Sequence, residues 1–400
     1  MVTFSKAAPA AVLALTLSLP LVTAGAAAAA GPPGTPSAAT APRSDARVLD
    51  RPELPRPTGP FAVGSSALHL VDRSRPDPWV PEADGRELMV TIHYPAARRA
   101  AGEPAPYATA EEARLLVEGA GFGGAVPPAE LRAMRTYARV DARPAGGRHP
   151  LVVLSPGFTV SRYTLTALAE DLASRGYVVA SVDHAYESYG IEVPGGRVLT
   201  CVACGEVLEG RAPASKVTAG RARDVSFVLD RLIGRHATDR FARMIDARRV
   251  GMAGHSIGGA STMTAMTGDR RIRAGVNMDG AFHDAVPAQG LGGRPFMMLG
   301  TGDEVHQPGG EDRTWDTTWR ALDGWKRWIT FTGADHYSFT DGPVIAEHFG
   351  LPRTPLPADR ALPLTRAYVA AFFDRHLRGT PQPLLDAPSP TNPEVSFHTP

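Results

Sequence analysis

Short apolar segments that alternate with amphipathic helical segments constrain the fold of this chain more than any other feature. The apolar runs, each bounded by Gly, Pro or Asp, span residues 88–94, 151–154, 177–182, 250–253, 274–278, 296–299 and 328–331. Runs of this length between turn residues predict buried strands. Helical periodicity fills intervals between them, as in residues 165–172 and 225–233. The alternation predicts an α/β fold with a mostly parallel central sheet, helices on both faces and loop insertions.

A Gly-x-Ser-x-Gly motif lies between one of these strands and a helix. It reads Gly254-His255-Ser256-Ile257-Gly258, after the strand at 249–253 and before a helical segment that begins near Ala260. A tight strand-to-helix turn lifts the serine hydroxyl above the sheet, and flanking glycines let neighbouring backbone approach it. The first amides of the helix point toward the reacting oxygen, so the Ile257 N–H can bind an oxyanion. The motif in this context predicts an α/β-hydrolase fold with Ser256 as nucleophile.

A serine nucleophile needs a general base, and in this fold the chain order is serine, acid, histidine. His336 fits because it follows the strand at 328–331 in a loop. The other histidines after Ser256 lie in a helix, in the tail or in loops without that context: His283, His306, His348, His376 and His398. Two aspartates follow strands and could orient the imidazole, Asp279 and Asp303. Residue order alone leaves both open.

The two ends of the chain differ in composition from its middle. Residues 1–30 contain one basic residue, an apolar run and a small-residue stretch, which predicts a signal peptide rather than a membrane anchor because two prolines interrupt the run. Residues 31–60 predict a Pro/Ala-rich linker, 61–386 one catalytic domain and 387–400 a Pro-rich tail. The net charge of +1 excludes a large basic surface for nucleic acid.

The only cysteines, Cys201 and Cys204, lie close together, and export would permit a disulfide between them. Metal ligation is disfavoured because further ligands are missing nearby, and a redox role lacks the expected strand and helix context. Asp183-His184, at a strand end, is expected to make structural hydrogen bonds rather than to bind a metal. We expect neither a metal nor an organic cofactor.

Several motifs together resemble the platelet-activating factor acetylhydrolase family of secreted esterases. By this resemblance the chain is similar to a secreted bacterial esterase or lipase of the α/β-hydrolase superfamily. They lie at 151–158, 171–177, 254–259, 277–280 and 335–341, so the resemblance covers most of residues 88–341. It implies that Asp279, in an Asn-x-Asp-Gly turn, is the acid and Asp303 the alternative. It also implies that Phe158 supplies the second oxyanion N–H. The sequence departs from the family at Pro156, where a histidine is usual, and in residues 187–215.

These features predict a secreted serine hydrolase that cleaves carboxylic esters through an acyl-enzyme on Ser256. The expected substrates are short-chain lipid or phospholipid-type acyl esters, with transient contact to lipid surfaces. Two insertions, 107–141 and 186–215, are expected to border the substrate. The alternatives are a secreted lipase or cutinase-like polyester hydrolase, a peptidase or amidase on the same residues, and a non-catalytic binding module on the same fold.

Overall fold

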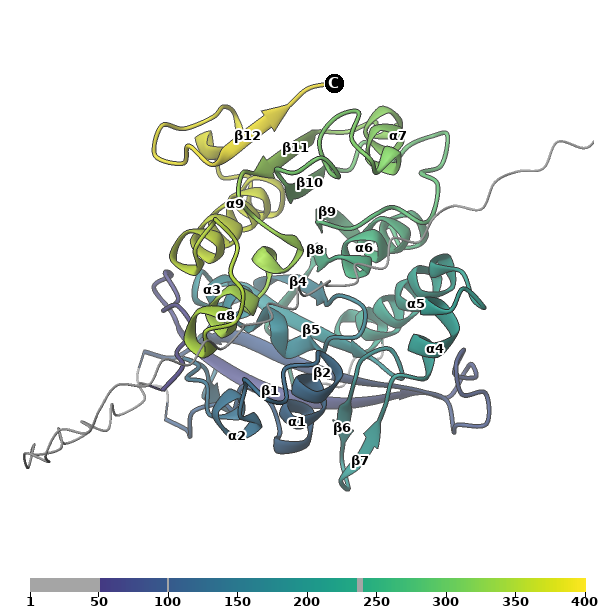
Figure 1. The fold of residues 1–400 in the computed structure, drawn as a ribbon, viewed down its shortest axis with the longest axis vertical. Coiled ribbons are helices and arrows are strands. Elements are labelled where there is room, and N and C mark those ends of the chain that lie inside the picture. The colour runs from purple at the N-terminus through teal and green to yellow at the C-terminus, as the bar shows by residue number, and fades with distance from the viewer. Residues whose placement is uncertain (1–50, 99–100, 236–239) are drawn as a thin grey trace, which may run out of the picture. The chain divides into compact units, whose positions relative to one another are not determined.

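In the computed structural model, which describes residues 51–98, 101–235 and 240–400, ten of the described strands form one sheet. Their order is β12-β11-β10-β9-β8-β4-β5-β2-β1-β3. The strands are β1 (Ala62–Asp72), β2 (Arg86–Ala96), β3 (Arg139–Val140), β4 (His149–Ser155), β5 (Val178–His184), β8 (Ile245–His255), β9 (Ile272–Met278), β10 (Phe296–Thr301), β11 (Lys326–Phe331) and β12 (Val395–His398). Every neighbouring pair from β11 to β5 in this order is parallel. β2 pairs antiparallel with β5, and β12 pairs antiparallel with β11. The predicted mostly parallel sheet is confirmed (Figure 1).

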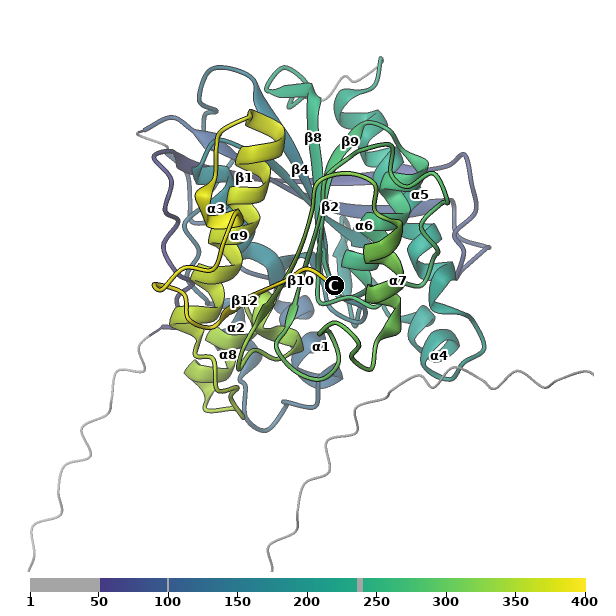
Figure 2. The ribbon, with the colours of Figure 1, turned by 90° about the horizontal axis from the view of Figure 1, so that it is seen from above.

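Helices cover both faces of this sheet. They are α1 (Ala110–Gly119), α2 (Pro128–Arg132), α3 (Thr166–Ser174), α4 (Val202–Leu208), α5 (Ala214–Ile233), α6 (Ile257–Gly268), α7 (Arg313–Ala321), α8 (Gly342–Phe349) and α9 (Ala358–Arg378). Figure 2 shows α3 and α9 on one side of the sheet and α5, α6 and α7 on the other. Within the described residues, no helix has both the length and the apolar character that crossing a membrane requires.

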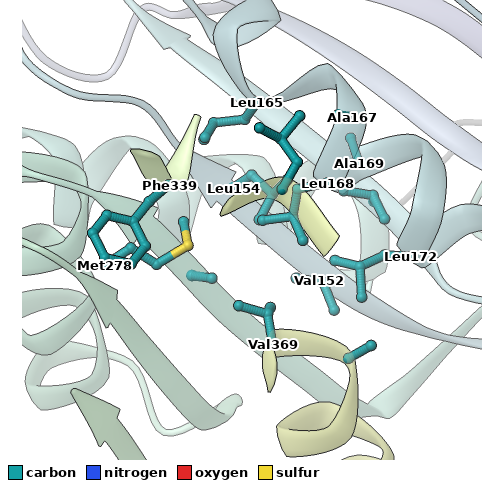
Figure 3. Close-up of a cluster of buried hydrophobic side chains, with 14 of the residues drawn as sticks. Val152, Leu154, Leu165, Ala167, Leu168, Ala169, Leu172, Met278, Phe339 and Val369 are labelled. Atoms are coloured by element: carbon teal, nitrogen blue, oxygen red, sulfur yellow. The ribbon is translucent and has the colours of Figure 1, made fainter. Parts of the chain in front are cut away.

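The two hydrophobic cores meet at the central strands, where successive side chains point to opposite faces. Val152 and Leu154 of β4 pack with Leu172 of α3 in one core (Figure 3). Leu151 and Val153, which alternate with them along β4, pack with apolar residues of α5 in the other core. Because both faces of these strands are buried, their sequences are continuous apolar runs rather than alternating ones.

The folded unit extends from Arg51 to Pro400 and so continues beyond both ends of the predicted domain, which was residues 61–386. At its start, Leu54 is buried, and the backbone N–H and hydroxyl of Thr58 both donate to Asp171 Oδ1 at 2.8 Å. At its end, residues of the predicted tail form β12 at the edge of the sheet. The predicted signal peptide and residues 31–50 of the predicted linker lie outside the described residues.

Both insertions fold into regular structure. Residues 107–141 form α1, α2 and β3, and their apolar side chains Leu131 and Met134 are buried in the core that contains α3. Residues 186–215 contain a hairpin of β6 (Ile191–Val193) and β7 (Arg197–Leu199), followed by α4. A disulfide joins Cys201 and Cys204, with the sulfurs 2.06 Å apart.

Candidate active site

Ser256 occupies a sharp turn between β8 and α6. Its backbone has φ 55° and ψ −128°, a conformation that a non-glycine residue rarely adopts and that costs on the order of 1–3 kcal/mol. The backbone around the turn is too close for side chains: a Cβ on Gly254 would lie 2.1 Å from the Gly258 backbone, and one on Gly258 would lie 2.1 Å from Ser155 O. The glycines of the motif are therefore required for this turn, which leaves Ser256 partly accessible.

A second turn, after β9, lies against this elbow. The Ser256 N–H donates to Met278 O at 2.8 Å. The Asn277 side chain closes the turn by accepting from Gly280 N at 2.9 Å and donating to Gly280 O at 2.7 Å. Asp279, between them, has a φ of 61°. The Asn-x-Asp-Gly sequence thus fixes a buried carboxylate beside the serine turn.

Asp279 contacts His336. The imidazole Nδ1 of His336 lies 2.7 Å from Asp279 Oδ2. His336 begins a single 3-10 turn (His336–Phe339) after β11, and its side chain is 44% exposed whereas that of Asp279 is 2% exposed. A carboxylate on Nδ1 favours the tautomer whose Nε2 is free to accept a proton.

Asp303, the alternative acid, is not brought to His336. Its side chain is exposed, and its Oδ1 accepts from the backbone N–H of Val305 at 3.0 Å in its own loop. Residue order did not separate Asp279 from Asp303, and Asp279 is the one that contacts His336.

His306 is a site residue that sequence reasoning missed. Its Nδ1 lies 2.8 Å from Asp279 Oδ1, the carboxylate oxygen that does not contact His336. Its Nε2 lies 3.5 Å from Asp312 Oδ2, and its ring packs at a tilt against that of Trp315 with centroids 4.5 Å apart. The loop after β10 that contains His306 carries no local sequence pattern that predicts this contact. The loop does start at the same edge of the sheet as the loops after β9 and β11, which contain Asp279 and His336.

Hydrogen bonds and neighbouring charges determine the protonation of Asp279 and His306. Burial alone would lower the pKa of His306, but hydrogen bonds and charge interactions with Asp279 and Asp312 raise it to about 9. Burial alone would raise the pKa of Asp279, but hydrogen bonds and charge interactions with His306 and His336 hold it well below its usual range. At neutral pH the site therefore contains an ionised Asp279 and a protonated His306.

Replacing His306 with glutamine is expected to change the pH dependence of stability. Because the pKa of folded His306, about 9, lies above the ordinary value of 6.5, its stabilisation is complete below pH 6.5 and is lost as the pH rises through 9. We expect the difference in unfolding free energy between wild type and His306→Gln to shrink by about 3 kcal/mol between pH 6 and pH 10. Urea denaturation at both pH values measures it, and a constant difference would contradict this assignment.

His255, which precedes Ser256, ties His336 to the elbow. Its Nε2 donates to the backbone oxygen of His336 at 2.7 Å, and the two rings lie 4.6 Å apart between centroids. Burial, followed by the neighbouring His336, lowers the pKa of His255 to about 3, so it is neutral. His255 therefore acts as a fixed donor to the segment that contains His336.

The two predicted oxyanion donors lie in one apolar cluster. Phe158 follows β4, Ile257 is the first residue of α6, and both pack with Trp79. Among the described residues, neither N–H meets an acceptor. Both amides are therefore free to bind an oxygen atom of a ligand.

The Asp183-His184 pair makes structural hydrogen bonds, as predicted. Asp183 forms an ion pair with Arg162, and His184 contacts Asp224 Oδ2 at 2.7 Å and Ser155 Oγ at 3.0 Å. In the described parts of the chain, no group of three or more His, Cys, Asp or Glu side chains is arranged to hold a metal ion.

Comparison with known proteins identifies the family. A family model described as platelet-activating factor acetylhydrolase, isoform II, matches residues 110–192. A probable 1-alkyl-2-acetylglycerophosphocholine esterase of Arthroderma benhamiae is 30% identical over 375 residues, which cover 86% of this chain and 93% of that protein. The chain belongs to the platelet-activating factor acetylhydrolase family. The acetylhydrolase of Canis lupus familiaris is more distant, with 23% identity over 58% of each chain.

A solved structure supports the fold and the ester-hydrolase activity of this member of the platelet-activating factor acetylhydrolase family. A ferulic acid esterase from Streptomyces cinnamoneus superposes with a TM-score of 0.77 at 45% sequence identity, covering 87% of this chain and all of that one. The α/β-hydrolase fold is thereby confirmed. The chain is a carboxylic ester hydrolase, as the sequence predicted.

Proposed function

We propose that Ser256, His336 and Asp279 form a catalytic triad that hydrolyses carboxylic esters through an acyl-enzyme. The observation that carries this proposal is the 2.7 Å contact between His336 Nδ1 and a buried, ionised Asp279 beside the strained serine turn. Strain at this position is kept because it presents the hydroxyl of Ser256 above the sheet.

In the acylation step, Ser256 Oγ attacks the ester carbonyl while His336 Nε2 takes the hydroxyl proton. Asp279 stabilises the imidazolium that forms. The proton then passes to the leaving alkoxide, which departs as the alcohol and leaves the acyl group on Ser256. Water, deprotonated by His336, attacks this acyl-enzyme in turn and releases the carboxylic acid.

The oxyanion of each tetrahedral intermediate would bind the N–H groups of Phe158 and Ile257. Neither N–H meets an acceptor within residues 51–98, 101–235 and 240–400, and Ile257 adds the positive end of the α6 dipole. Each such donor typically contributes a few kcal/mol to lowering the barrier.

For the substrate we propose esters with short acyl groups, with acetyl esters of lipids first. The support is the relative of 30% identity whose name specifies an acetylated glycerophosphocholine. The polyester or lipase alternative would require longer acyl groups to be cleaved well.

A hydroxycinnamoyl ester is a second candidate, because the chain is 45% identical to a ferulic acid esterase. Aromatic side chains also flank the site. Tyr337, directly after His336, is 51% exposed, its ring lies 6.0 Å from that of His255, and Phe158 is partly exposed. Rings at these positions could stack against an aromatic acyl group.

A substrate panel distinguishes these candidates. We expect kcat/KM for p-nitrophenyl esters to fall at least about tenfold from acetyl to octanoyl, the range that several methylenes can discriminate. Methyl ferulate and a 1-alkyl-2-acetylglycerophosphocholine complete the panel. If ferulate is the better substrate, Tyr337→Ala should lower its kcat/KM and spare that of the acetyl ester. A flat profile up to octanoyl would contradict the short-chain proposal and favour the lipase alternative.

The same panel tests the rival classes. A matched p-nitroanilide cleaved faster than its ester would indicate an amidase or peptidase, whose histidine must protonate a poor amine leaving group. Absence of activity on every ester would favour a binding module.

We also propose that the chain acts outside the cell after residues 1–30 are removed. The apolar N-terminal segment supports this, as does the disulfide between Cys201 and Cys204, since such bonds persist in oxidising compartments. The N-terminal peptide of protein recovered from culture medium tests it by mass spectrometry.

A further inference from the structure

A buried arginine lies directly behind the loop that follows β4. Arg221 of α5 is 1% exposed and belongs to a cluster of buried charges. Its Nε donates to Glu187 Oε2 at 2.7 Å, and Glu187 also pairs with Arg86 at 2.7 Å. Taking a guanidinium out of water is costly, so the other contacts of Arg221 indicate what it is placed to hold.

Those contacts are with the oxyanion loop, which we define as residues 155–159. The Nη1 group of Arg221 donates to Pro156 O and to Ser155 Oγ, the latter at 3.2 Å. Its Nη2 group donates to Gly157 O at 3.4 Å. One guanidinium therefore holds two successive backbone carbonyls at the turn where the chain leaves the sheet.

The second of these carbonyls belongs to the same peptide unit as the Phe158 N–H. A trans peptide is planar, so its C=O and N–H point in opposite directions. Fixing the Gly157 carbonyl against Arg221 therefore fixes the opposite direction for the Phe158 N–H. The positive charge at the carbonyl end also polarises the peptide, which makes its N–H a stronger donor.

Thr159, the residue after Phe158, is held by backbone hydrogen bonds to the segment that contains Glu187. Thr159 has a φ of 70°, its N–H donates to Glu187 O at 2.9 Å, and its carbonyl accepts from Tyr189 N at 2.8 Å. Glu187 thus holds Arg221 through its side chain and the oxyanion loop through its backbone.

We infer that Arg221 is a positioning residue that orients and polarises the Phe158 N–H toward the oxyanion, without touching the substrate. This inference rests on the proposed function, since it assigns a role within the same oxyanion site. It extends the active site to a buried residue of α5, 65 positions after Pro156 in the sequence.

The test compares Arg221→Met with Arg86→Met. Both remove a fully buried arginine from one charge cluster and from Glu187, but Arg86 donates to Asp77, Asp224, Glu187 and Ala185 O rather than to the oxyanion loop. In Arg221→Met, Glu187 keeps Arg86 and the indole N–H of Trp79 as partners. Arg221→Lys, which keeps the charge but not the planar fork, serves as a second variant if the methionine variant does not fold.

For Arg221→Met we expect kcat with p-nitrophenyl acetate to fall about 10- to 100-fold while KM changes less than about twofold, because the affected interaction forms only in the transition state. The affinity for a trifluoromethyl ketone, whose adduct with Ser256 carries an oxyanion, should fall by a similar factor. Arg221→Lys should show a smaller loss of both. Arg86→Met should lower Tm but change kcat and ketone affinity by less than about threefold.

Two results would show that Arg221 has only a structural role and that the inference is wrong. One is an equal reduction of ketone affinity and kcat in Arg221→Met and Arg86→Met. The other is an Arg221 variant that folds and binds the ketone as wild type does. Failure of the proposed function has a different signature, because wild type itself would then bind no ketone and Ser256→Ala would retain activity.

Discussion

Ser256→Ala is expected to lower kcat/KM for p-nitrophenyl acetate by about 10⁵- to 10⁶-fold, the loss that follows removal of a serine nucleophile. The residual rate would come from the oxyanion donors and from binding alone. Steady-state hydrolysis by purified wild type and variant measures this ratio.

The serine variant should remain folded, since it loses only a hydroxyl from a partly accessible side chain. Its Tm is the control and should stay within a few degrees of the wild-type value. A folded variant with more than about a tenth of wild-type activity would show that another residue is the nucleophile.

Asp279→Asn is expected to lower kcat by about 10³- to 10⁴-fold, because an amide at this position no longer holds the His336 tautomer or stabilises the imidazolium. The effect includes a second loss, since Oδ1 of Asp279 also accepts from protonated His306. The measurement is kcat at saturating substrate near neutral pH.

Asp303→Asn is the matched control for this prediction. Its carboxylate is exposed and, in the part of the chain that the structure describes, accepts from backbone N–H groups of its own loop, so kcat should change less than about threefold. The reverse ranking of the two variants would show that Asp303 is the acid.

The central fold could be predicted because its strands are buried on both faces. Strands such as β4 and β10 contain continuous apolar runs between turn residues, and that pattern does not depend on distant contacts. The serine turn could be predicted from its motif in the strand-to-helix context. Gly254 is required by contact with the nearby Gly258 backbone, whereas Gly258 is required by contact with the distant Ser155 O.

The strands of the ten-stranded sheet that were missed lie toward its edges. β1 pairs only with β2 and β3, and its sequence mixes apolar residues with Ser65, Ser66 and His69. β12 has four residues in a Pro-rich segment and pairs only with β11. Neither contains an apolar run, because an edge position needs less burial.

The two site residues that the sequence did not reveal act through long-range side-chain contacts. His306 meets Asp279 across 27 positions, and Arg221 meets Pro156 across 65. A histidine in a loop and an arginine in a helix resemble ordinary surface residues until the sheet brings their partners together. Such contacts follow from the fold and not from local pattern.

Ester cleavage through an acyl group on Ser256 is tested most directly by trapping that intermediate. Wild-type protein mixed with p-nitrophenyl acetate and quenched in acid within milliseconds should carry one acetyl group, and peptide mass spectrometry should locate it on Ser256. Ser256→Ala should carry none. An acetyl group on another residue, or turnover of wild type with no acylated protein at any quench time, would contradict an acyl-enzyme on Ser256.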